Sequence, residues 1–210
     1  WTLARPNSAF RNEVVEVDEV NQKGEVIRRK ELMELPAVVD DETMPKESWL
    51  VDFCRAERQQ GRKVLIYLRQ TGTRDIQDRI LKILRDGGVR AEVLSSGVNP
   101  RKREEWIARR VIGLDALVVN PKLVATGLDL IAFSSVVFLE IEYSLYVLWQ
   151  SLRRVWRLGQ TKPVKAIFSV YNDTMESRAL ALIGAKMKAA QLLYGDNVGG
   201  AIVPEEEGDI

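Results

Sequence analysis

The sequence predicts an α/β domain with a mainly parallel sheet, and two observations carry this prediction. Short apolar runs, typical of strands that are buried on both faces, recur between residues 64 and 170. Helical patterns of apolar residues separate these runs. Strands that alternate with helices are joined by right-handed crossovers into a parallel sheet covered on both faces, and such sheets bind ligands at the carboxyl ends of their strands.

The elements can be placed in order along the chain. Residues 13–35 alternate apolar and polar side chains around a glycine-containing turn, which predicts a β-hairpin. A helix from residue 45 to residue 60 follows, and Gly61 ends it. The remaining strands are expected at 64–68, 91–94, 116–119, 135–139 and 164–170, and the remaining helices at 76–86, 100–110, 145–160 and 174–193.

Composition limits the organisation and the chemistry. A chain of 210 residues with 46% hydrophobic residues is long enough for one substantial core. We therefore expect an appendage with the hairpin (1–44), one main domain (45–194) and a flexible acidic tail (195–210). Since the chain begins at Trp1 rather than at Met, we expect it to be a piece of a longer protein.

Several classes of function are excluded by residue counts. The sequence contains no His and a single cysteine, Cys54, so it has no Ser-His-Asp or Cys-His catalysis, no Cys/His zinc site and no internal disulfide. No metal site is predicted within the chain. No apolar run approaches the length of a membrane span, and no signal peptide is visible. The single cysteine indicates an intracellular compartment, either the cytoplasm and nucleoid or the nucleus.

Charge is distributed unevenly along the chain. The formal net charge is only +1, but between residues 61 and 110 there are 13 Lys and Arg against 6 Asp and Glu, a net charge of +7. A local basic segment of this kind can bind polyanions even when the whole chain is close to neutral.

The first expected loop at the carboxyl end of a strand suits an anion. Thr71, Gly72 and Thr73 follow the strand at 64–68 and open a helix, so their free backbone N–H groups can hold a phosphate. An ordinary threonine N-cap is the alternative.

The next loop repeats this character. Ser96 is followed by Arg101, Lys102 and Arg103 at the start of a helix that Asn99 is expected to cap. A solvated charge run is the alternative, but two successive loops that both suit anions at one edge of the sheet favour phosphate contact.

The loop after the strand at 116–119 offers two further candidates. Gly127 permits close approach of the backbone to a ligand, and Asp129 is an acceptor suited to a ribose hydroxyl or to orienting an arginine. A plain loop followed by a helix cap is the alternative.

Residues 150–160 carry a motif with separated apolar and basic faces. On a helix, Gln150, Arg154 and Arg157 share one face, while Leu148, Leu152 and Trp156 gather on the other. The two arginines form a planar donor fork that can clamp a phosphoryl group during transfer. An amphipathic helix with a solvated basic face is the alternative.

Taken together, these motifs resemble a known family. The loop at 70–72, the segment from Ser95 to Ile107, T-G-L-D-L at 126–130 and Q-x-x-x-R-x-x-R-x-G-Q at 150–160 are similar to helicase motifs IV, IVa, V and VI in their proper order. The arrangement resembles the second RecA-like lobe of superfamily two helicases, closest to the Swi/Snf-like DNA-dependent ATPases. The resemblance covers residues 45–190 and implies a RecA-like three-layer sandwich.

The resemblance implies a role for each matching residue. Arg154 and Arg157 would reach the γ-phosphate of ATP, with Arg157 as the arginine finger. Gln150 would couple the nucleotide to lobe closure, and Asp129 would meet the ribose or Arg157. The cofactors implied are ATP and Mg²⁺, both held mainly by a first RecA-like lobe of the same polypeptide, and Gly127 belongs to the same nucleotide-facing set.

The nucleic-acid contacts implied by the resemblance run along the backbone of double-stranded DNA, through the loop at 71–73 and through Ser96, Arg101 and Arg103. The chain departs from the family's usual pattern in three places. Arg153 replaces a small or acidic residue, Trp156 stands where His is usual and could fill core space, and Pro121-Lys122 replaces a Thr-Asp or Ser-Thr pair. The full-length protein is expected to be an ATP-driven DNA translocase or helicase, and the isolated chain is expected not to hydrolyse ATP. The competing prediction is a non-catalytic RecA-like module that binds nucleic acid or protein.

Overall fold

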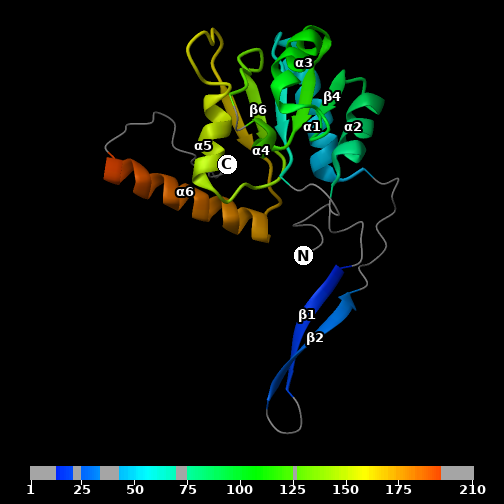
Figure 1. The fold of residues 1–210 in the computed structure, drawn as a ribbon, viewed down its shortest axis with the longest axis vertical. Helices are drawn as coiled ribbons and strands as arrows, with labels where there is room; N and C mark the ends of the chain where they lie inside the picture. Colours follow the sequence, from blue (N-terminus) through cyan, green and yellow to red (C-terminus); the bar gives the residue numbers. More distant parts are fainter. Residues whose placement is uncertain (1–12, 21–24, 34–42, 70–74, 125–126, 195–210) are drawn as a thin grey trace, which may run out of the picture.

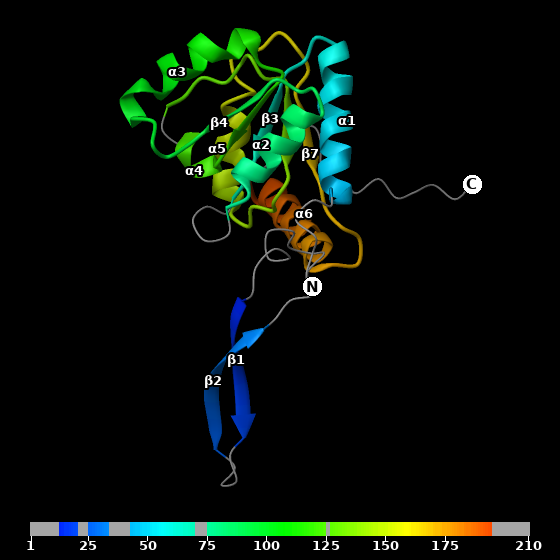
Figure 2. The same cartoon turned by 90° about the vertical axis from the view of Figure 1, so that its right-hand side faces the viewer.

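The computed structural model describes residues 13–20, 25–33, 43–69, 75–124 and 127–194. Within them, the main body is a parallel sheet of five strands in the order β4-β5-β3-β6-β7, which helices flank in Figure 1 and Figure 2. The strands are β3 (Val64–Tyr67), β4 (Ala91–Leu94), β5 (Ala116–Val119), β6 (Ser135–Phe138) and β7 (Lys165–Phe168). The predicted parallel α/β sheet is thereby confirmed.

The centre of the sheet is fully buried. In β3, Val64 aligns with Ala116 of β5 on one side and with Ser135 of β6 on the other. Every residue of β3, β5 and β6 is buried, which agrees with the continuous apolar runs in the sequence. The edge strand β7 departs from this pattern, because Lys165 and Ala166 are exposed.

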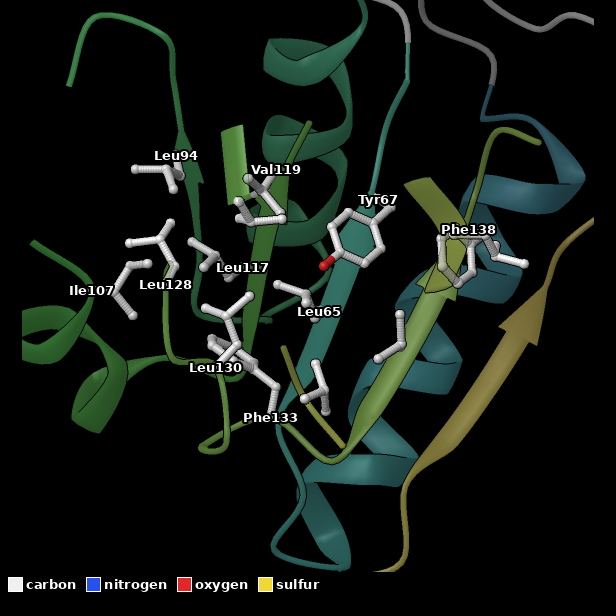
Figure 3. Close-up of a cluster of buried hydrophobic side chains, with 14 of the residues drawn as sticks. Leu65, Tyr67, Leu94, Ile107, Leu117, Val119, Leu128, Leu130, Phe133 and Phe138 are labelled. Carbon is white, nitrogen blue, oxygen red and sulfur yellow. The ribbon is translucent and has the colours of Figure 1, made fainter. Parts of the chain in front are cut away.

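Alternate residues of the strands supply two cores, one on each face of the sheet. Val64 and Ile66 pack with α1 (Pro45–Gln59) and α2 (Gln77–Asp86). Leu65 and Tyr67 point to the other face, where Figure 3 shows Leu65 near Leu130 and Phe133 and Tyr67 toward Phe138. That second face is covered by α3 (Arg103–Arg110), α4 (Pro121–Val124), α5 (Leu145–Arg153) and α6 (Met175–Tyr194).

A buried ion pair connects the starts of α1 and α6. Lys46 Nζ lies 2.6 Å from Glu176 Oε2 and also donates to the carbonyl oxygen of Leu139, at 3.2 Å. Burial lowers the pKa of Lys46 and raises the pKa of Glu176, because both charges are withdrawn from water. The pair therefore fixes the position of α6 relative to the carboxyl end of β6.

The helix predicted after Asn99 divides into two parts. The 3₁₀-helix η2 (Pro100–Lys102) comes first, and Asn99 caps it by accepting a hydrogen bond from the backbone N–H of Arg101 at 3.0 Å. The α-helix α3 and a second 3₁₀-helix, η3 (Val111–Gly113), follow. The expected cap is confirmed, although the first turn is tighter than an α-helical turn.

The predicted hairpin is also confirmed. Strands β1 (Glu13–Val20) and β2 (Val26–Met33) pair antiparallel, with Glu13 opposite Met33 and Val20 opposite Val26. Figure 1 shows this ribbon below the sheet and its helices. None of the described helices is both long and apolar enough to cross a bilayer.

Candidate nucleotide and nucleic-acid site

The predicted site residues lie in two places. The loop with Ser96 leaves the carboxyl end of β4, as predicted. In contrast, the turn with Arg154 and Arg157 lies beside Leu128–Phe133, the segment that leads into the amino end of β6. The fourth motif therefore packs against the end of the third motif and the residues that lead from it into β6, whereas the Ser96 loop lies at the carboxyl end of β4.

The helix that carries the fourth motif ends earlier than predicted. Helix α5 stops at Arg153, so Arg154 and Arg157 do not share a helical face with Gln150. The carbonyl oxygen of Arg154 accepts a hydrogen bond from the backbone N–H of Leu130 at 3.1 Å instead of continuing the helix. Gly159, with a φ of 99°, then turns the chain in a conformation that favours glycine.

Gln160 holds this turn in place. Its Nε2 donates to the carbonyl oxygens of Ile131, Phe133 and Val155 at 2.9, 3.1 and 3.2 Å. Its Oε1 accepts from the backbone N–H of Lys162 at 3.0 Å. The motif includes Gln160, but no role was predicted for this residue. A glutamine that directly follows a glycine in a turn can bond several backbone groups, and that pattern is the signal for its role.

The two motif arginines differ in their surroundings. Arg154 is half-buried, and its Nε atom is buried, whereas Arg157 is exposed. The guanidinium of Arg157 forms no hydrogen bond or ion pair with any residue that the structure describes. Both arginines border an open hollow of about 570 Å³, together with Arg153, Trp156 and Leu158. We call this hollow the arginine hollow.

Trp156 does not occupy core space. Its side chain is 59% exposed, which corrects the prediction that it continues the apolar stripe of the helix. The stripe ends with the helix, and Val155 instead of Trp156 is fully buried behind the turn. Leu158 is completely exposed. The arginine hollow thus has two apolar side chains on its rim.

A buried tyrosine is hydrogen-bonded to the helix that precedes the turn. Tyr67, the last residue of β3, donates its hydroxyl hydrogen to the carbonyl oxygen of Ser151 at 3.3 Å. Burial raises the pKa of Tyr67 above its usual range, even though the hydrogen bond to Ser151 and the nearby charge of Arg154 lower it. The tyrosine therefore stays neutral beside Arg154.

The other predicted nucleotide-facing residues have local partners. Gln150 Nε2 donates to the hydroxyl of Tyr146 at 2.8 Å. Asp129 is exposed, and its Oδ1 accepts from the backbone N–H of Ile131 at 3.2 Å. Gly127 has a φ of 71°, and a Cβ added there would meet no heavy atom within 4 Å. The positive φ of Gly127 is one that glycine adopts readily, and the ligand contacts of all three residues stay predictions.

At the carboxyl end of β4, the structure separates two arginines that the sequence treated alike. Arg101 is exposed, as is Ser96. Arg103 is buried, and its guanidinium donates to the carbonyl oxygens of Val98 and Leu123 at 3.2 and 3.1 Å. Arg103 therefore braces this loop, and Arg101 is the arginine that a polyanion can reach. The predicted residues Thr71, Gly72 and Thr73 lie outside the described residues.

These features define an α/β lobe of the RecA-like kind with a basic turn on one face of its sheet. A family model for the helicase conserved C-terminal domain matches residues 45–159, more than half of the chain. The chain belongs to this family. The resemblance read from the motifs is therefore confirmed.

Two relatives and one solved structure show the same kinship. The chain is 27% identical over 113 residues to the ATP-dependent helicase rhp16 of Schizosaccharomyces pombe, covering 53% of this chain and 13% of the relative. It is 27% identical over 141 residues to the helicase-like transcription factor CHR27 of Arabidopsis thaliana, covering 66% of this chain and 13% of the relative. The crystal structure of the C-terminal part of the Fun30 ATPase domain matches the fold with a TM-score of 0.55 and 18% identity, over 66% of this chain and 44% of that one.

Proposed function

We propose that the chain is the second motor lobe of an ATP-dependent DNA translocase or helicase. It would supply an arginine finger and contacts to the DNA backbone, while a first RecA-like lobe of the same polypeptide would hold most of the ATP and the Mg²⁺. One observation carries this proposal: Arg157 stands exposed near Arg154, on a turn that Gln160 holds against the segment leading into β6. The supporting relatives include an ATP-dependent helicase.

The chemistry of the arginine hollow fits a phosphate and does not fit a metal ion. Arg153, Arg154 and Arg157 border it, and no carboxylate of the described residues does. Bound ATP would supply the phosphoanhydride bond that water cleaves. Arg157 would donate hydrogen bonds to the oxygens of the γ-phosphate as negative charge accumulates on them, and Arg154 would add a second positive charge from its half-buried position.

The division into two surfaces follows from the same geometry. Arg101 and Ser96 are exposed at the carboxyl end of β4, and they would bind phosphates of double-stranded DNA. Arg103 would act there as a positioning residue. The main domain would extend over 45–194, with 1–44 as an appendage and 195–210 as a tail, and the protein would act inside the cell.

The test is Arg157→Ala in the full-length protein, with Arg153→Ala as the matched control. Both arginines border the same hollow, so a general change of local charge should affect both variants alike. We expect Arg157→Ala to lower ATP turnover by roughly 10³-fold or more, Arg153→Ala to lower it by less than about 10-fold, and DNA affinity to change little in either.

Two outcomes would count against the proposal. If Arg157→Ala keeps its ATP turnover, the arginine is no finger, and the non-catalytic binding module becomes the better interpretation. If the purified 210-residue chain hydrolyses ATP at a rate comparable to that of the full-length protein, the first lobe is not needed and the two-lobe proposal is wrong.

A further inference from the structure

A second basic hollow lies at the opposite end of β4 from the Ser96 loop. It measures about 470 Å³, and its border includes Arg85 at the end of α2, Arg90 just before β4, and Arg110 at the end of α3. Gly88 and Gly113 also line it, and a Cβ added at either glycine would meet no heavy atom within 4 Å. We call it the amino-end hollow. None of its residues belongs to the site described above.

The three arginines of the amino-end hollow are held in the same way. Each uses its Nε atom on a protein acceptor: Arg85 on the carbonyl oxygen of Ala91 at 3.1 Å, Arg90 on Asp115 Oδ2 at 3.1 Å, and Arg110 on Glu92 Oε2 at 2.8 Å. The guanidinium of Arg110 also stacks over the ring of Trp106, at 4.4 Å from the ring centroid. An arginine fixed through Nε loses little rotamer entropy when its outer nitrogens bind a ligand.

The outer nitrogens retain donors for such a ligand. Within the described part of the chain, neither Nη atom of Arg85 or Arg110 donates to a protein acceptor, and Arg90 uses only Nη2, on Asp115 Oδ1 at 2.6 Å. Three arginines face one carboxylate, Glu92, among the lining residues. These four residues carry a formal net charge of +2. Arg58 and Asp115, which form an ion pair behind the hollow, do not change that value.

Other cations at this end of the sheet have a different role. The helices end here, and the negative ends of their dipoles attract positive charge. Lys63 Nζ donates to the carbonyl oxygens of Val111, Ile112 and Leu114, and Arg55 Nε donates to that of Gly87. These side chains neutralise helix ends. Capping of this kind does not explain why the Nη atoms of Arg85 and Arg110 donate to no acceptor in the described part of the chain.

We propose that the amino-end hollow is a second binding site for the phosphate backbone of nucleic acid. The guanidinium groups are separate from one another and already held in place, and the hollow is open. Such an arrangement suits successive phosphates of a polymer better than one small anion. Arg90 and Ser95 flank β4, so the two ends of this strand lie roughly 17 Å apart. The hollow would therefore hold phosphates other than those at the Ser96 loop. This inference rests on the proposed function only in naming nucleic acid as the polyanion.

The sequence offers a matched pair of variants for the test. Arg110 and Arg109 are neighbours at the end of α3, and each forms an ion pair with a glutamate, Glu92 and Glu105 respectively. Only Arg110 borders the hollow. Binding of a labelled DNA duplex of about 20 base pairs to the 210-residue chain is measured by fluorescence anisotropy over a range of salt concentrations.

We expect Arg110→Ala to weaken binding about 3- to 10-fold and to reduce the slope of log affinity against log salt by about 0.9, the value for one phosphate contact. Arg109→Ala should change the affinity less than about 2-fold and leave that slope unaltered. Gly113→Glu removes no cation and adds a negative charge at the border of the hollow, so it should also weaken binding. Thermal unfolding of each variant verifies that it is folded.

Three results would overturn the inference. The first is an equal effect of Arg110→Ala and Arg109→Ala, and the second is unchanged binding by folded Gly113→Glu. The third is that Arg110→Ala weakens binding of a poly-glutamate peptide but not of DNA, which would identify an acidic protein segment as the occupant. Arg101→Ala tests the proposed DNA contact at the carboxyl end separately, so failure of one site is distinguishable from failure of the other.

Discussion

The amide of Gln160 should be a main source of stability for the arginine turn, and Gln160→Ala tests this. The substitution removes the two Nε2 hydrogens that are shared among three carbonyl oxygens, and of these contacts the ones with Phe133 and Val155 are partly buried and the one with Ile131 is exposed. A partly buried hydrogen bond contributes about 1 kcal/mol net, and an exposed bond contributes little because water replaces it. We therefore expect the free energy of unfolding to fall by about 2 kcal/mol.

Gln150→Ala is the matched control, since it removes an amide of the same kind that forms one exposed bond to Tyr146. Its expected cost is below about 0.5 kcal/mol. Urea unfolding followed by circular dichroism measures both variants, and equal denaturant slopes would show that the unfolded states are comparable. If the two variants lose the same stability, Gln160 does not fix the turn, and the exposure of Arg157 needs another cause.

Three further predictions concern stability. Burial raises the pKa of Asp115, but hydrogen bonds from its arginine partners hold the pKa at about 2, below the ordinary value of 3.8. About 2 kcal/mol of stability that is present above about pH 4 should therefore be lost as the pH falls to about 2. Urea unfolding at each pH measures this loss, and Asp115→Asn should not show it. Gly159→Ala should cost about 1 kcal/mol in thermal unfolding because of its positive φ, whereas Gly113→Ala, with space around its Cβ, should cost almost nothing, and equal costs would contradict the strain. Lys46→Met should lower the free energy of unfolding by roughly 3 kcal/mol or more, because it leaves the buried charge of Glu176 without its ion-pair partner. The double variant with Glu176→Leu should regain most of that stability. If the double variant regains none, the ion pair itself is stabilising.

The sheet and most helix positions follow from the sequence because burial alone determines them. A strand in the middle of a parallel sheet must be apolar on both faces, and Val64–Leu68 can satisfy this requirement in only one kind of place. Strand β7 is less regular, since an edge strand has fewer neighbours, and its boundaries were predicted too long. The strand order β4-β5-β3-β6-β7 is a tertiary property and was not predicted.

The candidate site was predicted in part. The order and spacing of the motifs indicated Arg154 and Arg157, which the structure places at the border of one hollow, and the motif also contains Gly159, whose positive φ favours glycine. The role of Arg103 could not be read from the sequence, since a buried bracing arginine and an exposed phosphate-binding arginine have the same letter. The amino-end hollow was also missed, because Arg85, Arg90 and Arg110 come from three separate elements.

The prediction of a continuous helix over residues 150–160 is wrong beyond Arg153, and this affects the two motif arginines. A continuous helix would place Arg157 one turn beyond Arg154, with both side chains held at a fixed angle. The observed turn uses the backbone of Arg154 to bind Leu130 and the side chain of Gln160 to bind the same segment, so the third and fourth motifs form one unit. A displacement of the backbone at Arg154 or of the side chain of Gln160 would therefore also displace the segment that enters β6. Under the proposed function, this connection would give the lobe a physical route from a nucleotide at Arg157 to the sheet that a free-standing helix would not provide.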